Sequence, residues 1–478
     1  MFFNSIDFAI FFPVVFFLYW LVFRRHLNAR NVFLIAVSYV FYGWWDWRFL
    51  SLIVISSFID FLCGQKIFQS ENKKNQKRWL ALSVIVNLGF LGFFKYFNFF
   101  IDSFIEAFSL FGTDLSGPSL NIILPVGISF YTFQTLSYTF DIYYKRLEPT
   151  KNIASFFAFV SFFPQLVAGP IERARNLLPQ FEKIHIPDYQ MIRSGLLLMA
   201  WGLFKKIVIA DRLAIFIDEV YGNLGEASGL PAIVAVLFFA LQLYLDFSAY
   251  SDIAIGSART LGFKLSLNFN RPYLATSFGD FWKRWHISLS SWFRDYVYIP
   301  LGGNRKGQAK MIKNIMIVFI LSGLWHGASW NFVIWGAING LFIVLLDRFL
   351  SIKSQKGGKR IIVSLFVTLM WTMSLVFFRA ETFQDAMTMM GNLFSSAGEL
   401  TLYDFGLNKT TFTMVWWIIV LYFLFEIIQE NRTNLYDWFY QRNAIIRWGV
   451  YLFLVAFTLL FGAYGVGLND ANFIYFQF

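Results

Sequence analysis

The sequence is poor in charge, in cysteine and in histidine. Asp, Glu, Lys and Arg together make up 14% of the 478 residues, whereas a typical soluble domain has about 25%. Cys63 is the single cysteine, which excludes an internal disulfide and a thiolate-rich metal cluster. The sequence has neither an H-E-x-x-H zinc motif nor a Walker-type phosphate loop. We therefore expect no metal site and no P-loop nucleotide site.

Apolar residues take the place of the missing charge. The chain is 57% hydrophobic and 21% aromatic. Apolar runs of roughly 18 to 20 residues, the length that crosses a bilayer as a helix, recur along it. A membrane β-barrel would instead alternate apolar and polar residues in short segments. The sequence therefore predicts an all-α, polytopic membrane protein.

The net charge of +11 taken alone could indicate a nucleic-acid partner. The basic residues cluster between the apolar runs, however, as the cytoplasmic loops of membrane proteins do. We therefore expect membrane lipid, and no nucleic acid, around this chain. The first apolar run, residues 8–23, is followed by Arg24, Arg25 and Arg30, with no basic residue before it and no A-x-A-like site after it. This pattern predicts a retained first span with the N-terminus outside.

The alternation of basic and uncharged loops predicts the topology. We expect about eleven or twelve transmembrane helices, with the C-terminal tail, residues 467–478, on the same outer side as the N-terminus. Residues 156–169 are apolar but short; Pro164 interrupts them and Gly169-Pro170 ends them. This favours a re-entrant segment packed within the protein. Without repeats or a linker, residues 1–478 are predicted to form a single transmembrane domain.

One segment, residues 257–313, differs from the rest in its charge. It holds ten Lys or Arg residues against Asp280 and Asp295, so we expect it to form the main cytoplasmic face. It is also rich in aromatic side chains, which we expect to insert partly at the membrane interface. These are Phe278, Phe281, Trp282, Trp285, Trp292 and Phe293.

Two of the four histidines are candidates for chemistry. His326, in SGLWHGASWNF, lies thirteen residues beyond Lys313, which is about 20 Å along a helix and well inside the bilayer. Ionisable groups at that depth usually serve a function, although a neutral histidine bonded between helices is the alternative. His286 lies in the basic segment and taken alone is compatible with ordinary surface. We assign no role to His26 or His185.

A transporter is also compatible with these features, but only Asp246 and Asp252 supply acids within a clear span, so a proton relay would be sparse. Five blocks of sequence discriminate further. They are PVGISFYTFQTLSYTFDIY (125–143), FFPQLVAGPIERARNLLPQF (162–181), QLYLDFSAYSDIAIG (242–256), FWKRWHISLSSWFRDYVYIPLGGNR (281–305) and SGLWHGASWNFVIWGAING (322–340).

In this order the blocks resemble the membrane-bound O-acyltransferase (MBOAT) family, most of all its bacterial alginate O-acetyltransferase-like branch. The resemblance implies helices around a central two-sided funnel. It also implies that His326 is the membrane-embedded catalytic histidine and that His286 is a second functional histidine on the cytoplasmic side. Acyl thioesters occur in the cytoplasm and the acceptor polysaccharide outside, and a histidine between them can act as general base.

The expected donor is acetyl-CoA or an acyl-carrier thioester, used as a substrate rather than as a tightly bound cofactor. Its phosphates could be bound by basic side chains of the cytoplasmic segment, each of which could equally be a positive-inside charge. The candidates are Lys283, Arg284, Arg294 and Arg305.

The tail ends in FIYFQF (473–478). Its Tyr475 could be an aromatic anchor at the interface, but the segment resembles a C-terminal motif of related acyltransfer systems. That resemblance implies that Tyr475 carries the acyl group as an ester and that a periplasmic partner passes it to the glycan. A phenol, with a pKa near 10, is easier to deprotonate than a sugar hydroxyl.

The expected function is therefore that of an acyltransferase in the bacterial inner membrane, with both termini periplasmic. It would supply acetyl groups to alginate, another exopolysaccharide or a cell-wall glycan. The alternatives are a D-alanyltransferase for teichoic acid and a non-catalytic transporter.

Overall fold

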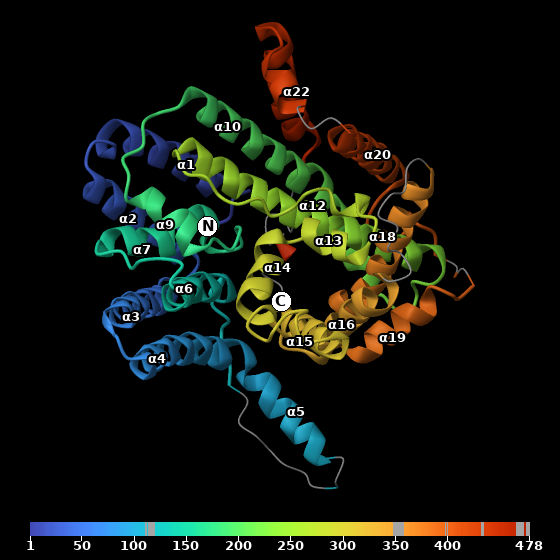
Figure 1. The fold of residues 1–478 in the computed structure, drawn as a ribbon. Coiled ribbons are helices and arrows are strands. Elements are labelled where there is room, and N and C mark those ends of the chain that lie inside the picture. Colours follow the sequence, from blue (N-terminus) through green and yellow to red (C-terminus); the bar gives the residue numbers. More distant parts are fainter. Residues whose placement is uncertain are drawn as a thin grey trace. The chain divides into compact units, whose positions relative to one another are not determined.

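The computed structural model describes residues 1–109, 112, 120–347, 358–396, 398, 400–431, 435–464 and 473–474, with the backbone alone for 435–437. Every regular element within these ranges is a helix (Figure 1). Eight helical stretches of the described chain are long and apolar enough to cross a membrane. They are Ile6–Phe23, Leu27–Gln69, Lys73–Ser109, Leu230–Thr260, Gln308–His326, Gly358–Arg379, Lys409–Asn431 and Ala444–Phe461.

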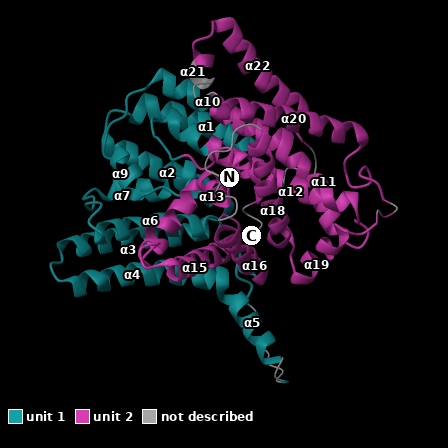
Figure 2. Ribbon diagram, turned by 45° about the vertical axis from the view of Figure 1, so that its right-hand side comes forward, with its two compact units in different colours: residues 1–196, 254–266, 327–329 teal, residues 197–253, 267–326, 330–478 magenta. Residues whose placement is uncertain are grey.

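This arrangement confirms the predicted class, an all-α polytopic membrane protein. The chain divides into two compact units (Figure 2). Unit 1 contains residues 1–196, 254–266 and 327–329, and unit 2 contains residues 197–253, 267–326 and 330–478.

Unit 1 begins with a series of capped or interrupted helices. Ser5 and Asn72 cap two of them, each accepting a hydrogen bond from a backbone N–H in the first turn. Asp46 has an extended backbone and so separates two apolar helices. The elements are α1 (Ile6–Leu18), η1 (Tyr19–Phe23), α2 (Leu27–Asp46), η2 (Trp47–Phe49), α3 (Leu50–Gln69), α4 (Lys73–Leu91), η3 (Gly92–Tyr96), α5 (Phe97–Ser109), α6 (Ile128–Tyr143), α7 (Ile153–Ser161), α8 (Phe163–Leu166), α9 (Ala174–Phe181) and the start of α10 (Tyr189–Leu203).

The interrupted segment predicted over residues 156–169 consists of α7 and α8. With nine and four residues, they are too short to cross a bilayer. Phe156, Phe159 and Phe163 have no measurable exposure. The sequence-based prediction of a short segment packed within the protein is thus confirmed.

A buried polar network joins α3, α4 and α6 in unit 1. Asp60 accepts hydrogen bonds from Ser83 Oγ at 2.6 Å and from Asn87 Nδ2 at 2.8 Å. The Oδ1 of Asn87 in turn accepts from Ser56 Oγ and Thr135 Oγ1, at 2.7 and 3.1 Å. All five side chains are buried. Lipid tails are as apolar as the helices, so the hydrophobic effect does not drive the helices together within a membrane. Interhelical hydrogen bonds of this kind contribute to their association instead.

Unit 2 contains His286 and His326. Several of its helices include π-helical stretches, which disturb the regular ladder and occur often at functional sites. The elements that follow α10 are η4 (Phe204–Ala210), α11 (Asp211–Gly222), α12 (Leu230–Thr260), η5 (Pro272–Leu274), α13 (Phe278–Arg284), α14 (Ile287–Phe293), η6 (Arg294–Tyr298), α15 (Gln308–His326), α16 (Trp330–Leu341), η7 (Phe342–Leu346), α18 (Gly358–Arg379), α19 (Phe383–Asn392), α20 (Lys409–Asn431), α21 (Leu435–Tyr440) and α22 (Ala444–Phe461).

Candidate active site

His326 is the last residue of α15, a helix long and apolar enough to span a membrane. Its side chain is buried, with 5% of the residue exposed. Aromatic rings surround the imidazole: the centroids of Trp325, Trp335 and Phe378 lie 5.0, 5.2 and 5.4 Å from its own. The histidine therefore lies in a protein interior rather than against lipid, as an intramembrane ionisable group should.

A close crossing of α15 and α16 supports this position. A Cβ added to Gly323 would lie 2.1 Å from the carbonyl oxygen of Phe332, and one added to Gly336 would lie 2.3 Å from that of Phe319. Only glycine allows backbones to approach so closely. Gly323, three residues before His326, thus lets α15 and α16 pack closely beside the histidine.

His286 occupies the junction between α13 and α14 and is fully buried. Its φ of 41° lies in the left-handed region, which costs a non-glycine residue about 1–2 kcal/mol. Two backbone bonds from an extended segment hold the junction in place: Asn270 N–H donates to the Arg284 carbonyl, and Ile287 N–H donates to the Asn268 carbonyl. Backbone strain that the surroundings enforce in this way is typical of functional sites.

Asn268 also fixes the protonation of the His286 ring. Asn268 Nδ2 donates to Ser251 Oγ, so its Oδ1 is the acceptor for Ser288 Oγ at 2.8 Å and for His286 Nδ1 at 3.1 Å. Nδ1 therefore carries the hydrogen, and Nε2 has the lone pair. Burial lowers the pKa of His286 from 6.5 to about 3, so the ring is neutral at physiological pH.

The structure brings the two predicted histidines together. The ring centroids of His286 and His326 are 6.4 Å apart, and the Trp325 ring lies 5.9 Å from that of His286. The two imidazoles therefore lie in one buried site, and a neutral imidazole is a group that can act as a general base.

The aromatic residues of the segment 257–313 do not lie where the sequence suggested. We expected the six to insert at the membrane interface, but each is at most 9% exposed. Trp285, for example, packs on Trp371 and Phe269, with ring centroids 4.6 and 5.1 Å away. All six belong to the protein core, so that interpretation was wrong.

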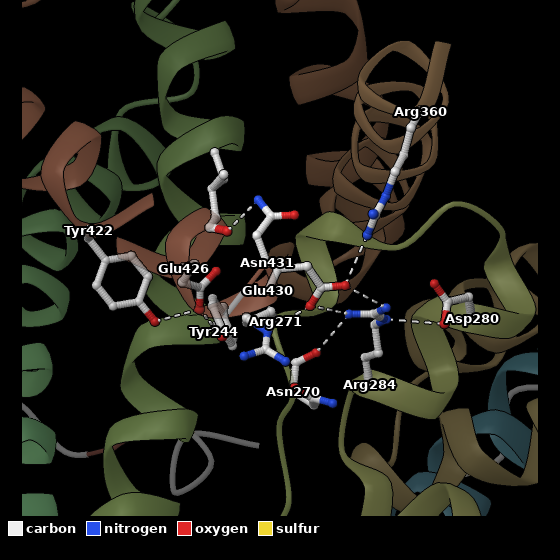
Figure 3. Close-up of polar contacts among 11 residues, drawn as sticks. Tyr244, Asn270, Arg271, Asp280, Arg284, Arg360, Tyr422, Glu426, Glu430 and Asn431 are labelled. Carbon is white, nitrogen blue, oxygen red and sulfur yellow. Dashed lines mark hydrogen bonds and ion pairs between the residues drawn. The ribbon is translucent and has the colours of Figure 1, made fainter. Parts of the chain in front are cut away.

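The basic candidates for binding the donor differ among themselves. Lys283, Arg294 and Arg305 are exposed, and Arg294 forms an ion pair with the neighbouring Asp295. Arg284 is half-buried and bonded to Asp280 and Glu430. Figure 3 shows the Arg284 guanidinium directed at Glu430, on which Arg271 and Arg360 also converge. Arg284 is therefore committed to a protein ion-pair network, whereas the other three side chains face outward.

The remaining sequence candidates lie elsewhere. Tyr475, the predicted acyl carrier, lies outside the described residues. His26 is exposed. His185, in unit 1, contacts the Phe263 ring and bonds to the Gln180 carbonyl through Nε2.

The sequence did not point to a pair of buried lysines on η4. Lys205 pairs with Asp252 at 2.8 Å, and Lys206 pairs with Asp246 at 2.7 Å and with Asp211 at 2.8 Å. Asp246 and Asp252 had been noted as acids within a span, but their partners are about 40 residues away. The local signal was the Lys-Lys pair within the apolar stretch WGLFKKIVIA.

His326 thus ends a helix that is long and apolar enough to span a membrane, and a second buried histidine, His286, lies beside it. Residues 40–380, more than half of the chain, match the sequence pattern of the membrane-bound O-acyltransferase family. The protein belongs to this family and is an acyltransferase of the membrane.

Three bacterial relatives illustrate the similarity. A probable alginate O-acetylase of Azotobacter vinelandii is 39% identical over 86% of this chain and 80% of its own length. A peptidoglycan O-acetyltransferase of Helicobacter pylori is 32% identical over 98% of this chain and 95% of its own length. A teichoic acid D-alanyltransferase of Streptococcus thermophilus is 26% identical, over 55% of this chain and 67% of its own length.

Proposed function

We propose that this protein moves acetyl groups from a cytoplasmic thioester across the bacterial inner membrane to O-acetylate an exported polysaccharide. The acetyl group and the glycan acceptor are supported by two relatives that cover most of this chain, a probable alginate O-acetylase and a peptidoglycan O-acetyltransferase. The observation that carries the proposal is the pair of buried histidines: His326 ends a helix long enough to span the bilayer, and His286 lies beside it.

His326 acts as the general base in this proposal. It takes the proton from an acceptor hydroxyl as that oxygen attacks the thioester carbonyl. The new C–O bond forms, the C–S bond breaks, and the leaving thiolate receives the proton from the imidazolium. His286 is the second functional histidine: its Nε2 lone pair accepts a hydrogen bond and thereby orients the reacting groups from the cytoplasmic side.

The donor is acetyl-CoA or an acyl-carrier thioester, bound transiently. Its phosphates meet the exposed Lys283, Arg294 and Arg305, since these side chains are accessible. Arg284 contributes less, because its guanidinium is bonded to Glu430 and Asp280. Such electrostatic contacts weaken with salt, and so should donor binding.

The first acceptor is Tyr475 in the tail, and both termini are periplasmic. A phenyl ester is more activated than an alkyl ester, so a periplasmic partner can pass the acetyl group on to the glycan. The membrane lipid surrounds the spans, and nucleic acid has no part in the reaction.

The test is the intact mass of the purified full-length protein before and after incubation with acetyl-CoA. The wild type should gain one acetyl group on Tyr475, and Tyr475→Phe should gain none there. His326→Ala should slow transfer by about 100-fold or more, as expected for loss of a general base. The matched control is His26→Asn, which changes an exposed histidine and should transfer normally.

Each rival predicts a different result. A D-alanyltransferase would leave acetyl-CoA unused and add D-alanine from a charged carrier protein. A transporter without catalysis would retain glycan acetylation in His326→Ala at wild-type abundance, which would overturn the proposal. Acetylated glycan in cells that carry only Tyr475→Phe would overturn the tyrosine relay alone.

A further inference from the structure

The buried charges on η4, α11 and α12 are not balanced among themselves, because Lys205 and Lys206 face Asp211, Asp246 and Asp252. Lys206 Nζ lies 2.7 Å from Asp246 Oδ1 and 2.8 Å from Asp211 Oδ1. The three side chains are at most 8% exposed. One ammonium group therefore faces two carboxylates in a buried site, where each unbonded acceptor is costly. Asp246 Oδ2 needs a donor that neither lysine supplies.

The C-terminal segment supplies that donor. The backbone N–H of Ile474 donates to Asp246 Oδ2 at 2.7 Å. The preceding residue, Phe473, places its ring 4.3 Å from Lys206 Nζ and 4.7 Å from the Tyr250 ring. Phe473 and Ile474 are each 2% exposed. One residue of the tail thus contacts the anion of the pair, and its neighbour contacts the cation.

Residues 204–212, which form η4 and the start of α11, also contact the chain near the end of α22. Ala463 N–H donates to the Ile207 carbonyl at 2.9 Å, and Arg212 Nη2 donates to the Phe461 carbonyl at 2.8 Å. Residues 204–212 therefore contact the C-terminal part of the chain at two separate places. The π-helical form of η4 is in keeping with this, since such turns occur often at functional sites.

We propose that Lys206 and Asp246 form a docking site for the C-terminal segment and act as positioning residues for Tyr475, which directly follows Ile474. Asp246 binds a backbone N–H and so fixes the register of the segment, while Lys206 and Tyr250 select an aromatic side chain at position 473. The docking itself rests only on these contacts. Its purpose, to present the Tyr475 hydroxyl for acylation, rests on the proposed function.

Docking is measured independently of acyl transfer by digesting the detergent-solubilised full-length protein with a carboxypeptidase. Intact mass spectrometry follows the release of Ile474. Phe473→Ala, which alters the tail alone, and Asp246→Asn, which alters the site, should each speed that release by about tenfold or more. The first loses a buried ring and its cation–π contact, and the second loses the charge of a charge-assisted bond. The control is Asp252→Asn, which removes the partner of Lys205 on the same helix but does not alter the Lys206–Asp246 pair or its contacts with residues 473 and 474.

The rate of acetyl transfer in the same variants separates the two proposals. Faster release with a lower kcat and an unchanged KM for acetyl-CoA supports both docking and its purpose. Faster release with unchanged transfer supports docking and overturns the role of Tyr475. Release at the wild-type rate in Phe473→Ala, or equally fast release in Asp252→Asn, overturns docking whatever the transfer rate. His326→Ala should lose transfer while Ile474 remains protected.

Discussion

The two units both bury polar side chains among apolar helices, but they do so at different kinds of position. In unit 1, Asp60, Ser83 and Asn87 lie within continuous helices, and their hydrogen bonds connect one helix to another. In unit 2, His326 ends α15, and His286 lies between α13 and α14. Lys206 belongs to a π-helical turn.

The difference has a physical basis. A polar group in the middle of a helix can be satisfied by the neighbouring helix, and its use is to hold the two together. A polar group at a helix end or a π-helical turn lies where the backbone ladder is already interrupted, so a substrate or a second segment can approach. Unit 1 thus illustrates polar side chains used for packing, and the chemistry that we propose for unit 2 uses polar side chains at such interruptions.

The largest effect on stability should come from a substitution at Gly323, which lies three residues before His326 in α15. Gly323→Ala would place a methyl group 2.1 Å from a backbone oxygen, and the helices would have to separate at a cost of about 1–3 kcal/mol. The thermal unfolding midpoint should fall, and transfer per folded molecule should fall with it, because His326 lies one turn away. The matched change, Gly89→Ala in α4, meets no atom within 4 Å. It should leave both quantities unchanged or raise the midpoint slightly; an equal loss in the two variants would remove the distinction between the units.

The second effect is a loss of folding stability at acidic pH, which we expect from His286. Its folded-state pKa, lowered by burial to about 3, is below its unfolded value of 6.5. The unfolded chain therefore binds more protons below pH 6.5, so this contribution to stability is complete above that pH and is lost as the pH falls toward 3. The slope approaches about 1.4 kcal/mol per pH unit.

His286→Gln should remove this part of the acid dependence, whereas His26→Gln should retain it. Unfolding midpoints measured from pH 7 to pH 4 in detergent test the difference. The same slope in all three proteins would mean that the His286 ring is not buried as described.

Hydropathy and motifs predicted much of this architecture. Long apolar runs predicted the helical spans, and the W-H-G and W-K-R-W-H blocks pointed to His326 and His286, which the fold brings together. These signals are local, and each depends on residues adjacent in the chain. The proline-interrupted run around Pro164 likewise predicted a short buried segment.

The missed features depend on distant partners. Composition cannot distinguish an aromatic side chain that faces lipid from one that faces protein, so Trp285 and its neighbours were assigned to the interface although they are buried. Lys206 is a positive charge in an apolar run until Asp246 and Ile474, both remote in sequence, are placed beside it. Nor does the sequence around His286 reveal a positive φ, since no glycine or asparagine marks it.

The smallest effect should come from Asp60→Asn in unit 1. The amide can still accept from Ser83, but its nitrogen would face the Asn87 Nδ2 that now donates to Asp60 Oδ2. One buried hydrogen bond is lost, at a cost of about 1 kcal/mol. We expect a slightly lower unfolding midpoint and transfer per folded molecule within about twofold of the wild type, since a packing contact stabilises the fold without taking part in the reaction. If transfer fell steeply while the midpoint held, the Asp60 network would belong to the chemistry, and polar groups within continuous helices would have to be considered alongside those at helix ends.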